Sequence, residues 1–374
     1  MDFEFPPDTL MLRDMLQRFI QKEVRPLEMK YYTSGGLSPE ERARLRKAVE
    51  QLGLWGLMVP EEFGGGGLDT VTACLIEEEL GGTFIPVEIG NIPVALYACE
   101  GEQVDRYLEP ALAGDRRAIL AVREPGVQSF LPLNWSTAAR PDGEEFILNG
   151  KKVLGTPPSP EDFFIVFSKI QNGSTSQELT AFLLEPGTAG LSLLPGKEFL
   201  IEFQDCRMGH DQILGKPGSA LEFTKEEAPR AWVQTGARYV GMVERLIEMA
   251  TEHARDWMVF EAPLAARPAI QRMLADLRIE VESSRWLVYH TAWLIDTGKS
   301  DRIRCSAAQV RLATGIMLQR AVDTITMIYA GPGPTAQIEP QRLVQSVVPP
   351  EALQLAIEHT RAFVAADMLH LSKV

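Results

Sequence analysis

Cysteine, histidine and positive charge are scarce in this chain, and each shortage excludes a class of protein. The 374 residues include four cysteines that are far apart and form no Cys-x-x-Cys pair, namely Cys74, Cys99, Cys206 and Cys305. Isolated cysteines are typical of unpaired, buried thiols in a reducing compartment. The five histidines show no spacing of metal ligands, so the sequence predicts no metal site.

The charge balance argues against polyanionic partners. Lys and Arg number 37 against 51 Asp and Glu, which leaves a net charge of −14 and a pI near 5.0. Nucleic acids and anionic membrane surfaces are bound by basic faces. We therefore expect neither nucleic acid nor membrane as a partner.

Long apolar runs are also missing. No run is long enough to span a bilayer, and the first five residues are acidic and aromatic rather than a basic segment followed by an apolar one. The sequence thus predicts a cytoplasmic protein. Its apolar content of 45% is enough for one large core or for two to three smaller ones.

Helical patterns fill the N-terminal part. Apolar residues recur at helical spacing over residues 8–25, with Asp8 as the candidate cap. Ser38, Pro39 and Glu41 have the spacing of a capping box with proline at the first helical position, which predicts a helix that starts at Pro39. Another helix is predicted through residues 76–81.

Strand patterns are confined to the middle of the chain. Short apolar runs, separated by segments rich in glycine, proline, asparagine and serine, occur at residues 146–148, 163–167 and 181–184. Asn149-Gly150 is the strongest two-residue hairpin signal, and residues 141–143 (Pro-Asp-Gly) predict a further turn.

Long helical patterns return after residue 229, roughly over 231–258, 267–297 and 302–329. Their apolar faces belong either to the core or to a partner surface, and include Leu287, Trp293, Ile316 and Met317. Helix, sheet and helix without an internal repeat predict three domains. These are a helical domain at 1–117, a β domain at 118–222 and a helical bundle at 223–374.

Two segments of the middle part carry a family resemblance. Arg-Glu-Pro-Gly-Val-Gln-Ser at 123–129 resembles the Thr-Glu-Pro-Gly-x-Gly-Ser-Asp loop of acyl-CoA dehydrogenases. Leu-Asn-Gly-Lys-Lys at 148–152 resembles that family's Leu-Asn-Gly-x-Lys, which leads into Trp-Ile-Thr. Residues 53–65 and 241–298 are similar to other signatures of the family. The resemblance implies an α+β fold with a helical N-terminal domain, a middle β domain and a C-terminal four-helix bundle that forms the oligomer interface.

The resemblance also implies α,β-dehydrogenation of an acyl-CoA with FAD, followed by electron transfer to an electron-transfer flavoprotein. In this chemistry a glutamate removes the α proton while the flavin takes the β hydride. Glu351 is the carboxylate at a position comparable to the family's C-terminal Glu-Gly-Thr, although Gly-Thr is absent. Because Glu351 follows Pro350, it equally has the pattern of an acidic residue in a first helical turn. Another branch of the family points to Glu226 and Glu227, which also fit a solvated charge run.

On the β domain, the resemblance implies that a subunit contacts its own flavin through hydroxyls and a strand. Ser129 and Thr156 are retained there. Arg123 stands where the family has Thr, and Leu154 stands where it has Trp. Arg123 is therefore a candidate replacement charge, or else the partner of a carboxylate such as Glu124.

Further flavin contacts come, by the same resemblance, from a neighbouring chain. Phe260 and Gly331 are retained at these positions. Four other positions differ, with an arginine, two glutamines and a glycine replaced by Trp257, Pro268, Met327 and Ala330. An uncharged indole in place of a guanidinium forfeits charge-assisted bonds to pyrophosphate, worth about 1.5–3 kcal/mol each.

Two hypotheses follow. The chain is either a divergent FAD-dependent acyl-CoA dehydrogenase, as a homo- or heterotetramer, or a non-catalytic or half-site subunit that needs a paralogous partner. We favour a family member that works within a heteromeric acyl-CoA dehydrogenase. An oxygen-using flavin oxidase or monooxygenase is a third, more distant reading.

Overall fold

A computed structural model describes most of the chain, and the described part forms two compact units. It covers residues 4–34, 36–126, 135–155, 158–171, 179–194, 199–300, 302–329, 344, 348 and 350–369, without the side chains of 224–227, 350–352 and 355–356. The helical unit comprises Met1–Pro60, Gly66–Ile89 and Ala228–Val374. The sheet unit comprises Glu61–Gly65 and Gly90–Glu227. The predicted domain boundaries near residues 118 and 223 stay a prediction.

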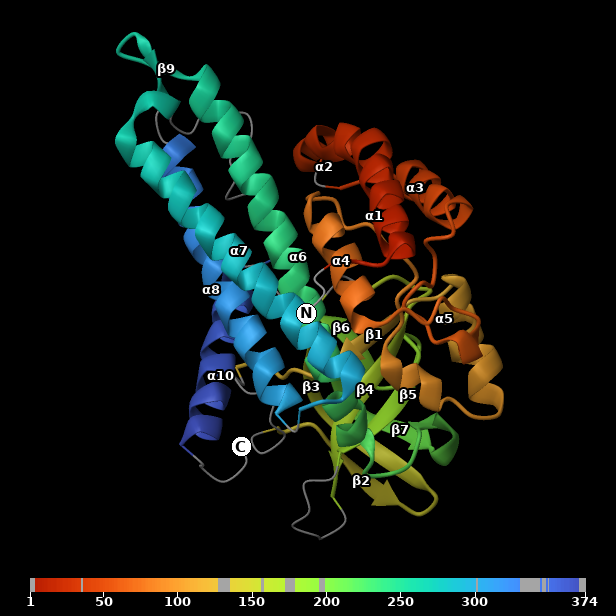
Figure 1. The fold of residues 1–374 in the computed structure, drawn as a ribbon. Helices are drawn as coiled ribbons and strands as arrows, with labels where there is room; N and C mark the ends of the chain where they lie inside the picture. The colour runs from red at the N-terminus through yellow and green to blue at the C-terminus, as the bar shows by residue number, and fades with distance from the viewer. Residues whose placement is uncertain are drawn as a thin grey trace. The chain divides into compact units, whose positions relative to one another are not determined.

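Figure 1 shows the helices and strands in chain order. The α-helices are α1 (Pro7–Phe19), α2 (Glu28–Ser34), α3 (Pro39–Gln51), α4 (Thr70–Gly81), α5 (Glu109–Ala113), α6 (Ala220–Asp256), α7 (Pro268–Thr297), α8 (Ile303–Tyr329) and α10 (Pro350–Met368). The strands are β1 (Ala118–Ala121), β2 (Ala138–Asp142), β3 (Glu145–Leu154), β4 (Phe163–Ile170), β5 (Leu179–Leu184), β6 (Leu191–Leu194), β7 (Phe199–Gly209), β8 (Ile213–Leu214), β9 (Met258–Val259) and β10 (Ala262–Pro263).

Of the two helix caps predicted in the N-terminal part, one is confirmed and one was wrong. The predicted capping box is confirmed, because Glu41 N–H donates to Ser38 Oγ while Ser38 N–H donates to the Glu41 carboxylate. The prediction of Asp8 as a cap was wrong. Pro6 is the N-cap of α1, and Asp8 lies inside the first turn, where its charge favours the helix dipole instead.

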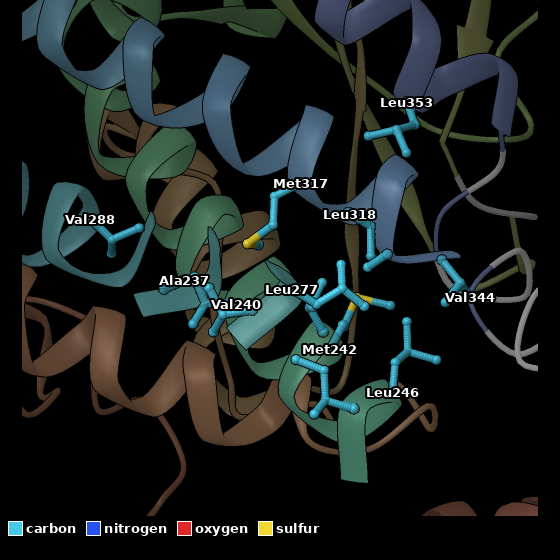
Figure 2. Close-up of a cluster of buried hydrophobic side chains, with 14 of the residues drawn as sticks. Ala237, Val240, Met242, Leu246, Leu277, Val288, Met317, Leu318, Val344 and Leu353 are labelled. Carbon is cyan, nitrogen blue, oxygen red and sulfur yellow. The ribbon is translucent and has the colours of Figure 1, made fainter. Parts of the chain in front are cut away.

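The four helices α6, α7, α8 and α10 form a bundle with an apolar core. Figure 2 shows side chains of these helices pointing toward one another, among them Leu246, Leu277 and Leu318. Of the residues predicted for a core or partner surface, Met317 is fully buried and Leu287 and Ile316 pack against this core. Trp293 is exposed.

The sequence placed the start of α6 too late. The predicted helix at 231–258 in fact begins at Ala220 and ends at Asp256. The apolar period is weaker in the first turns, and Pro229 inside the helix obscures them. The predicted helices at 267–297 and 302–329 are confirmed almost to the residue by α7 and α8.

Helix α4 is held against α7 by charged groups. Asp296, in the last turn of α7, accepts hydrogen bonds from the N–H groups of Thr70 and Val71 at the start of α4. Arg285 of α7 donates to Glu78 of α4 over 2.8 Å. Both residues lie in the 241–298 segment that resembles the family, and their described contacts hold α4 and α7 together.

In the sheet unit, one mixed sheet has the strand order β6-β7-β3-β2-β4-β5-β8, and β1 pairs with β4. The β1–β4 and β2–β4 pairs are parallel, and the others are antiparallel. All three predicted apolar runs are strands, within β3, β4 and β5. The β domain of the predicted α+β fold is therefore confirmed.

The hairpin prediction at Asn149-Gly150 was wrong. Both residues lie inside β3, where the register with β7 shifts between Leu148 and Gly150 as a β-bulge. Glycine is required there because a Cβ at Gly150 would lie 2.6 Å from the Cα of Thr137. The turn predicted at 141–143 is confirmed, since β2 and β3 pair across it from Asp142 to Glu145.

Cysteine chemistry and membrane topology can be stated for the described residues. All four cysteines are free and buried. Within the described ranges, no helix combines the length and the apolarity needed to cross a bilayer. The cytoplasmic location stays a prediction.

Candidate functional site

In the sheet unit, the two segments that carry the family resemblance lie side by side. The first leaves β1 at Val122 and the second ends β3 at Leu154. Their backbones are joined by a hydrogen bond from Val153 N–H to the carbonyl oxygen of Arg123, 2.8 Å long. Two motifs some 30 positions apart in sequence are therefore direct neighbours in this unit.

A buried ion pair lies beneath this junction. Lys152 Nζ is 3.3 Å from Glu124 Oε1, and the two side chains are 0% and 2% exposed. The same ammonium donates to the carbonyl oxygen of Val122 over 2.8 Å and lies 3.5 Å from the centre of the Trp135 ring. An ammonium over an indole face is a favourable cation–π contact.

The carboxylate of Glu124 is fully engaged on its other side. It accepts hydrogen bonds from Ser136 N–H at 2.7 Å, Ser136 Oγ at 2.9 Å and Thr137 N–H at 2.8 Å. Burial raises the pKa of Glu124, but these hydrogen bonds and the Lys152 charge outweigh it and hold that pKa below its usual value. Glu124 is therefore a structural anion, which sequence analysis had considered only as a partner for Arg123.

Each segment has a glycine, Gly126 or Gly155, at the end of its described part. A Cβ built on Gly126 or on Gly155 would meet no described atom within 4 Å. Leu154, in the family's Trp position, is buried in the sheet core instead of facing this surface. Ser129 and Thr156 lie outside the described residues, so their predicted roles, like that of Arg123, stay predictions.

In the helical unit, Phe260 occupies the tip of a strained hairpin. β9 and β10 pair antiparallel around Phe260 and Glu261, and the hairpin projects from the ends of α6 and α7 (Figure 1). Both turn residues have positive φ, 49° and 60°, which two-residue hairpins usually assign to Asn-Gly. The Phe260 side chain is 90% exposed. The fold thus accepts backbone strain to present a phenyl ring to its surroundings.

An aromatic stack lies beside this hairpin. His253 packs against Tyr329 with ring centres 4.2 Å apart and against Trp257 at 5.7 Å, both nearly parallel. His253 Nε2 is buried without a hydrogen-bond partner among the described residues, and burial lowers the pKa of His253. The stack is therefore an uncharged surface near neutral pH. Trp257, its outermost ring, is partly exposed at the position where the resemblance implies an arginine.

One cation at this hairpin was missed by sequence reasoning. Arg267 donates to the carbonyl oxygen of Val259 over 2.6 Å, and its guanidinium carbon lies 5.9 Å from the centre of the Phe260 ring. Within the described ranges, no carboxylate forms an ion pair with Arg267. In the sequence, Arg267 stands out only as the residue before Pro268, which begins α7, and this position does not indicate a contact with Phe260.

The remaining neighbour-side positions are partly described. Met327 on α8 and Pro268 at the start of α7 are both exposed. Neither side chain carries the amide that the resemblance implies. Ala330 and the candidate Gly331 lie outside the described residues.

The candidate bases lie on helices. Glu351 is the second residue of α10, and Glu226 and Glu227 lie inside α6. The side chains of all three are outside the described part of the structure. A catalytic role for Glu351 stays a prediction.

Comparison with known sequences identifies two matching family models. "Acyl-CoA dehydrogenase, N-terminal domain" matches residues 6–115, and "Acyl-CoA dehydrogenase, C-terminal domain" matches residues 227–368. Together they span more than half of the chain. The matches end on either side of the sheet, the part that carries the two joined segments.

Individual relatives agree over nearly the whole length. (R)-Benzylsuccinyl-CoA dehydrogenase of Thauera aromatica is 29% identical, over 89% of this chain and 88% of its own. The human mitochondrial short-chain specific acyl-CoA dehydrogenase is 27% identical, over 98% and 91%. Among solved structures, an acyl-CoA dehydrogenase complexed with FAD from Bacillus anthracis has a TM-score of 0.80 and 25% identity, over 98% of this chain and 69% of that one.

Proposed function

Because the chain belongs to the acyl-CoA dehydrogenase family of FAD-dependent oxidoreductases, we propose that it takes part in the α,β-dehydrogenation of an acyl-CoA thioester as one subunit of a heteromeric enzyme. The observation that carries the heteromeric proposal is the indole of Trp257 at the neighbour-side arginine position. The sheet unit keeps the two joined segments that resemble the family's, whereas the helical unit presents an uncharged stack. This chain would then supply the sheet-side contacts of a flavin site, and a paralogous partner would supply the neighbour-side arginine.

The residues of the sheet unit fit FAD in part. Arg123, Ser129, Thr156 and the backbone near Gly126 and Gly155 would hold the flavin from this chain. FAD, when bound, would supply the acceptor for the β hydride. Glu351 would take the α proton of the acyl-CoA, provided that its carboxylate is desolvated enough to be basic. An electron-transfer flavoprotein would take up the electrons.

A homo-oligomeric flavoenzyme is the second candidate, and Arg267 favours it. This guanidinium lies beside exposed Phe260 without a described carboxylate partner, so it could bind a phosphate in place of the lost arginine. Arg123 could add charge from the sheet unit. The two candidates differ in whether the chain alone holds FAD tightly.

The test is titration of the purified chain with FAD, followed by flavin fluorescence. We expect weak binding, because two charge-assisted bonds at about 1.5–3 kcal/mol each correspond to roughly two to four orders of magnitude in affinity. The double variant Trp257→Arg/Met327→Gln should recover much of that loss. Met11→Arg, on an exposed methionine of α1, is the control for added charge alone.

Tight, stoichiometric FAD in the unmodified chain would reject the heteromeric proposal. Arg267→Ala then decides whether Arg267 has rebuilt the site, since its loss should weaken FAD binding at least tenfold, or about 1.4 kcal/mol. Co-expression with a paralogous partner tests the heteromer directly, because a yellow complex should form where the lone chain is colourless.

A further inference from the structure

Two ion pairs bracket strand β1 in the sheet unit, one at each end. Arg117, just before β1, binds Asp162 just before β4 over 2.7 Å. Glu124, just after β1, binds Lys152 of β3. Only the second pair lies between the two segments that carry the proposed flavin contacts.

The Lys152 ammonium contacts the residues that follow β1 and a residue that precedes β2. It donates to Val122 O, pairs with Glu124 and lies over Trp135. Glu124 in turn accepts from Ser136 and Thr137. The pair therefore ties residues 122–124 to residues 135–137 and fastens both to the end of β3.

Stability alone is a weak reason to bury this pair. Desolvation of two charges costs about as much as their attraction returns, and buried pairs can often be replaced by apolar residues without loss. Such a pair does fix the local geometry, because a buried charge that is separated from its partner is strongly destabilising. Here the geometry that it fixes is the backbone of Arg123 beside Val153.

We propose that Lys152 and Glu124 are positioning residues for FAD, whose buried pair holds residues 122–126 beside the end of β3 in the arrangement that binds the flavin. This inference rests on the proposed function. Neither side chain touches the cofactor, and both act through the backbone atoms that they hold.

If Lys152 positions the flavin-binding backbone, FAD affinity should depend on the protonation of its ammonium. Burial lowers the pKa of Lys152 to about 8, although Glu124 opposes this shift, and the nearby Lys169 lowers it further. Glu124 and Lys169 are the described charged groups that act on this ammonium. Above pH 8 Lys152 loses its proton, and the pair with it.

The experiment measures the FAD dissociation constant and the melting temperature of matched variants, in whichever form binds FAD: the lone chain, the Trp257→Arg/Met327→Gln variant or the co-expressed complex. Lys152→Met should weaken FAD binding by roughly tenfold to a hundredfold, the equivalent of one charge-assisted contact. Lys152→Met/Glu124→Gln leaves no unpaired buried charge, so its melting temperature should recover while its FAD affinity stays low. Arg117→Met, at the other end of β1, should lower the melting temperature without changing FAD affinity.

The pH dependence of FAD affinity distinguishes a positioning role of Lys152 from a purely structural one. Between pH 7 and pH 9 the FAD affinity of the unmodified protein should fall, and that of Lys152→Met should stay level. If FAD affinity follows melting temperature across all variants, or if both pH profiles coincide, the positioning role is wrong although FAD binds. If no form binds FAD, the proposed function fails and this inference fails with it.

Discussion

Gly241 of α6 and Gly81 of α4 are in direct backbone contact. A Cβ built on Gly241 would lie 3.1 Å from the Cα of Gly81 and 1.8 Å from the carbonyl oxygen of Glu78. No side chain fits between the two helices at this crossing. Gly81, the last residue of α4, is thus required by helix packing within the helical unit.

We predict that Gly241→Ala destabilises the protein strongly. The added methyl must push two backbones apart, and overpacking of this kind costs about 1–3 kcal/mol or more. Thermal unfolding followed by circular dichroism measures the change. Gly187→Ala is the matched control, because a Cβ there meets nothing within 4 Å. Equal melting temperatures for both variants would contradict the close crossing.

A second prediction concerns pH and Glu79 of α4. Burial raises the pKa of Glu79 to about 6, although Gln17 donates a hydrogen bond to it. Because this folded-state pKa lies above the unfolded value, the ionised carboxylate costs stability at pH 7. That cost is lost as the pH falls from 6 toward 4.5.

Glu79→Gln should therefore stabilise the protein at pH 7 by about 1–2 kcal/mol more than it does at pH 4.5. Urea unfolding at the two pH values measures the difference. Glu62→Gln, at an exposed carboxylate, should show no such pH dependence. A benefit of Glu79→Gln that is equal at both pH values would argue against a raised pKa.

Local signals in the sequence were sufficient for much of the fold. The capping box at Ser38 and the apolar periods of α7 and α8 are short-range patterns, so their outcome depends little on the rest of the chain. Asn149-Gly150 failed for the opposite reason. Its glycine is required by the close approach of Thr137, the residue just before β2, and no local pattern distinguishes a bulge from a hairpin.

The candidate site was harder to predict because its geometry depends on distant pairs. The sequence marked Glu124 and Lys152 only as letters in two motifs, and their pairing 28 positions apart required the sheet. Phe260 was predicted from resemblance, but its strained turn and the neighbouring Arg267 were not. Ser129, Thr156, Gly331 and the side chain of Glu351 lie outside the described part of the structure, so their roles stay predictions.

The hairpin tip gives a third prediction. Glu261 has φ of 60°, a region that costs a residue with a Cβ about 1–2 kcal/mol and costs glycine little. Glu261→Gly should therefore raise stability by about 1 kcal/mol in denaturant unfolding. The same change at exposed Glu252, inside α6, should lower stability by about 1 kcal/mol, since glycine is unfavourable in a helix. Destabilisation by both variants would mean that the Glu261 side chain has a contact of its own.

The last prediction concerns self-association through the bundle. Along α7, Ile279, Trp286 and Trp293 follow one another at seven-residue intervals and are 66%, 53% and 45% exposed. Residues at this spacing share one side of a helix. Large apolar side chains in a row on a surface mark a contact with another chain, because soluble monomers rarely expose contiguous apolar patches. We therefore expect a dimer or tetramer at micromolar concentration, with a second copy or a paralogue on this face of α7.

Trp286 occupies the middle of this row, so Trp286→Glu should dissociate the oligomer. A charge in the centre of an apolar contact loses the burial of an aromatic ring, worth about 2–3 kcal/mol, in each copy that contributes it. Light scattering over a concentration series measures the shift toward monomer. Met11→Glu, on an exposed methionine of α1, is the control and should leave the mass unchanged. A monodisperse monomer in the unmodified protein, alone and with its paralogue, would show that this face of α7 meets solvent rather than a partner.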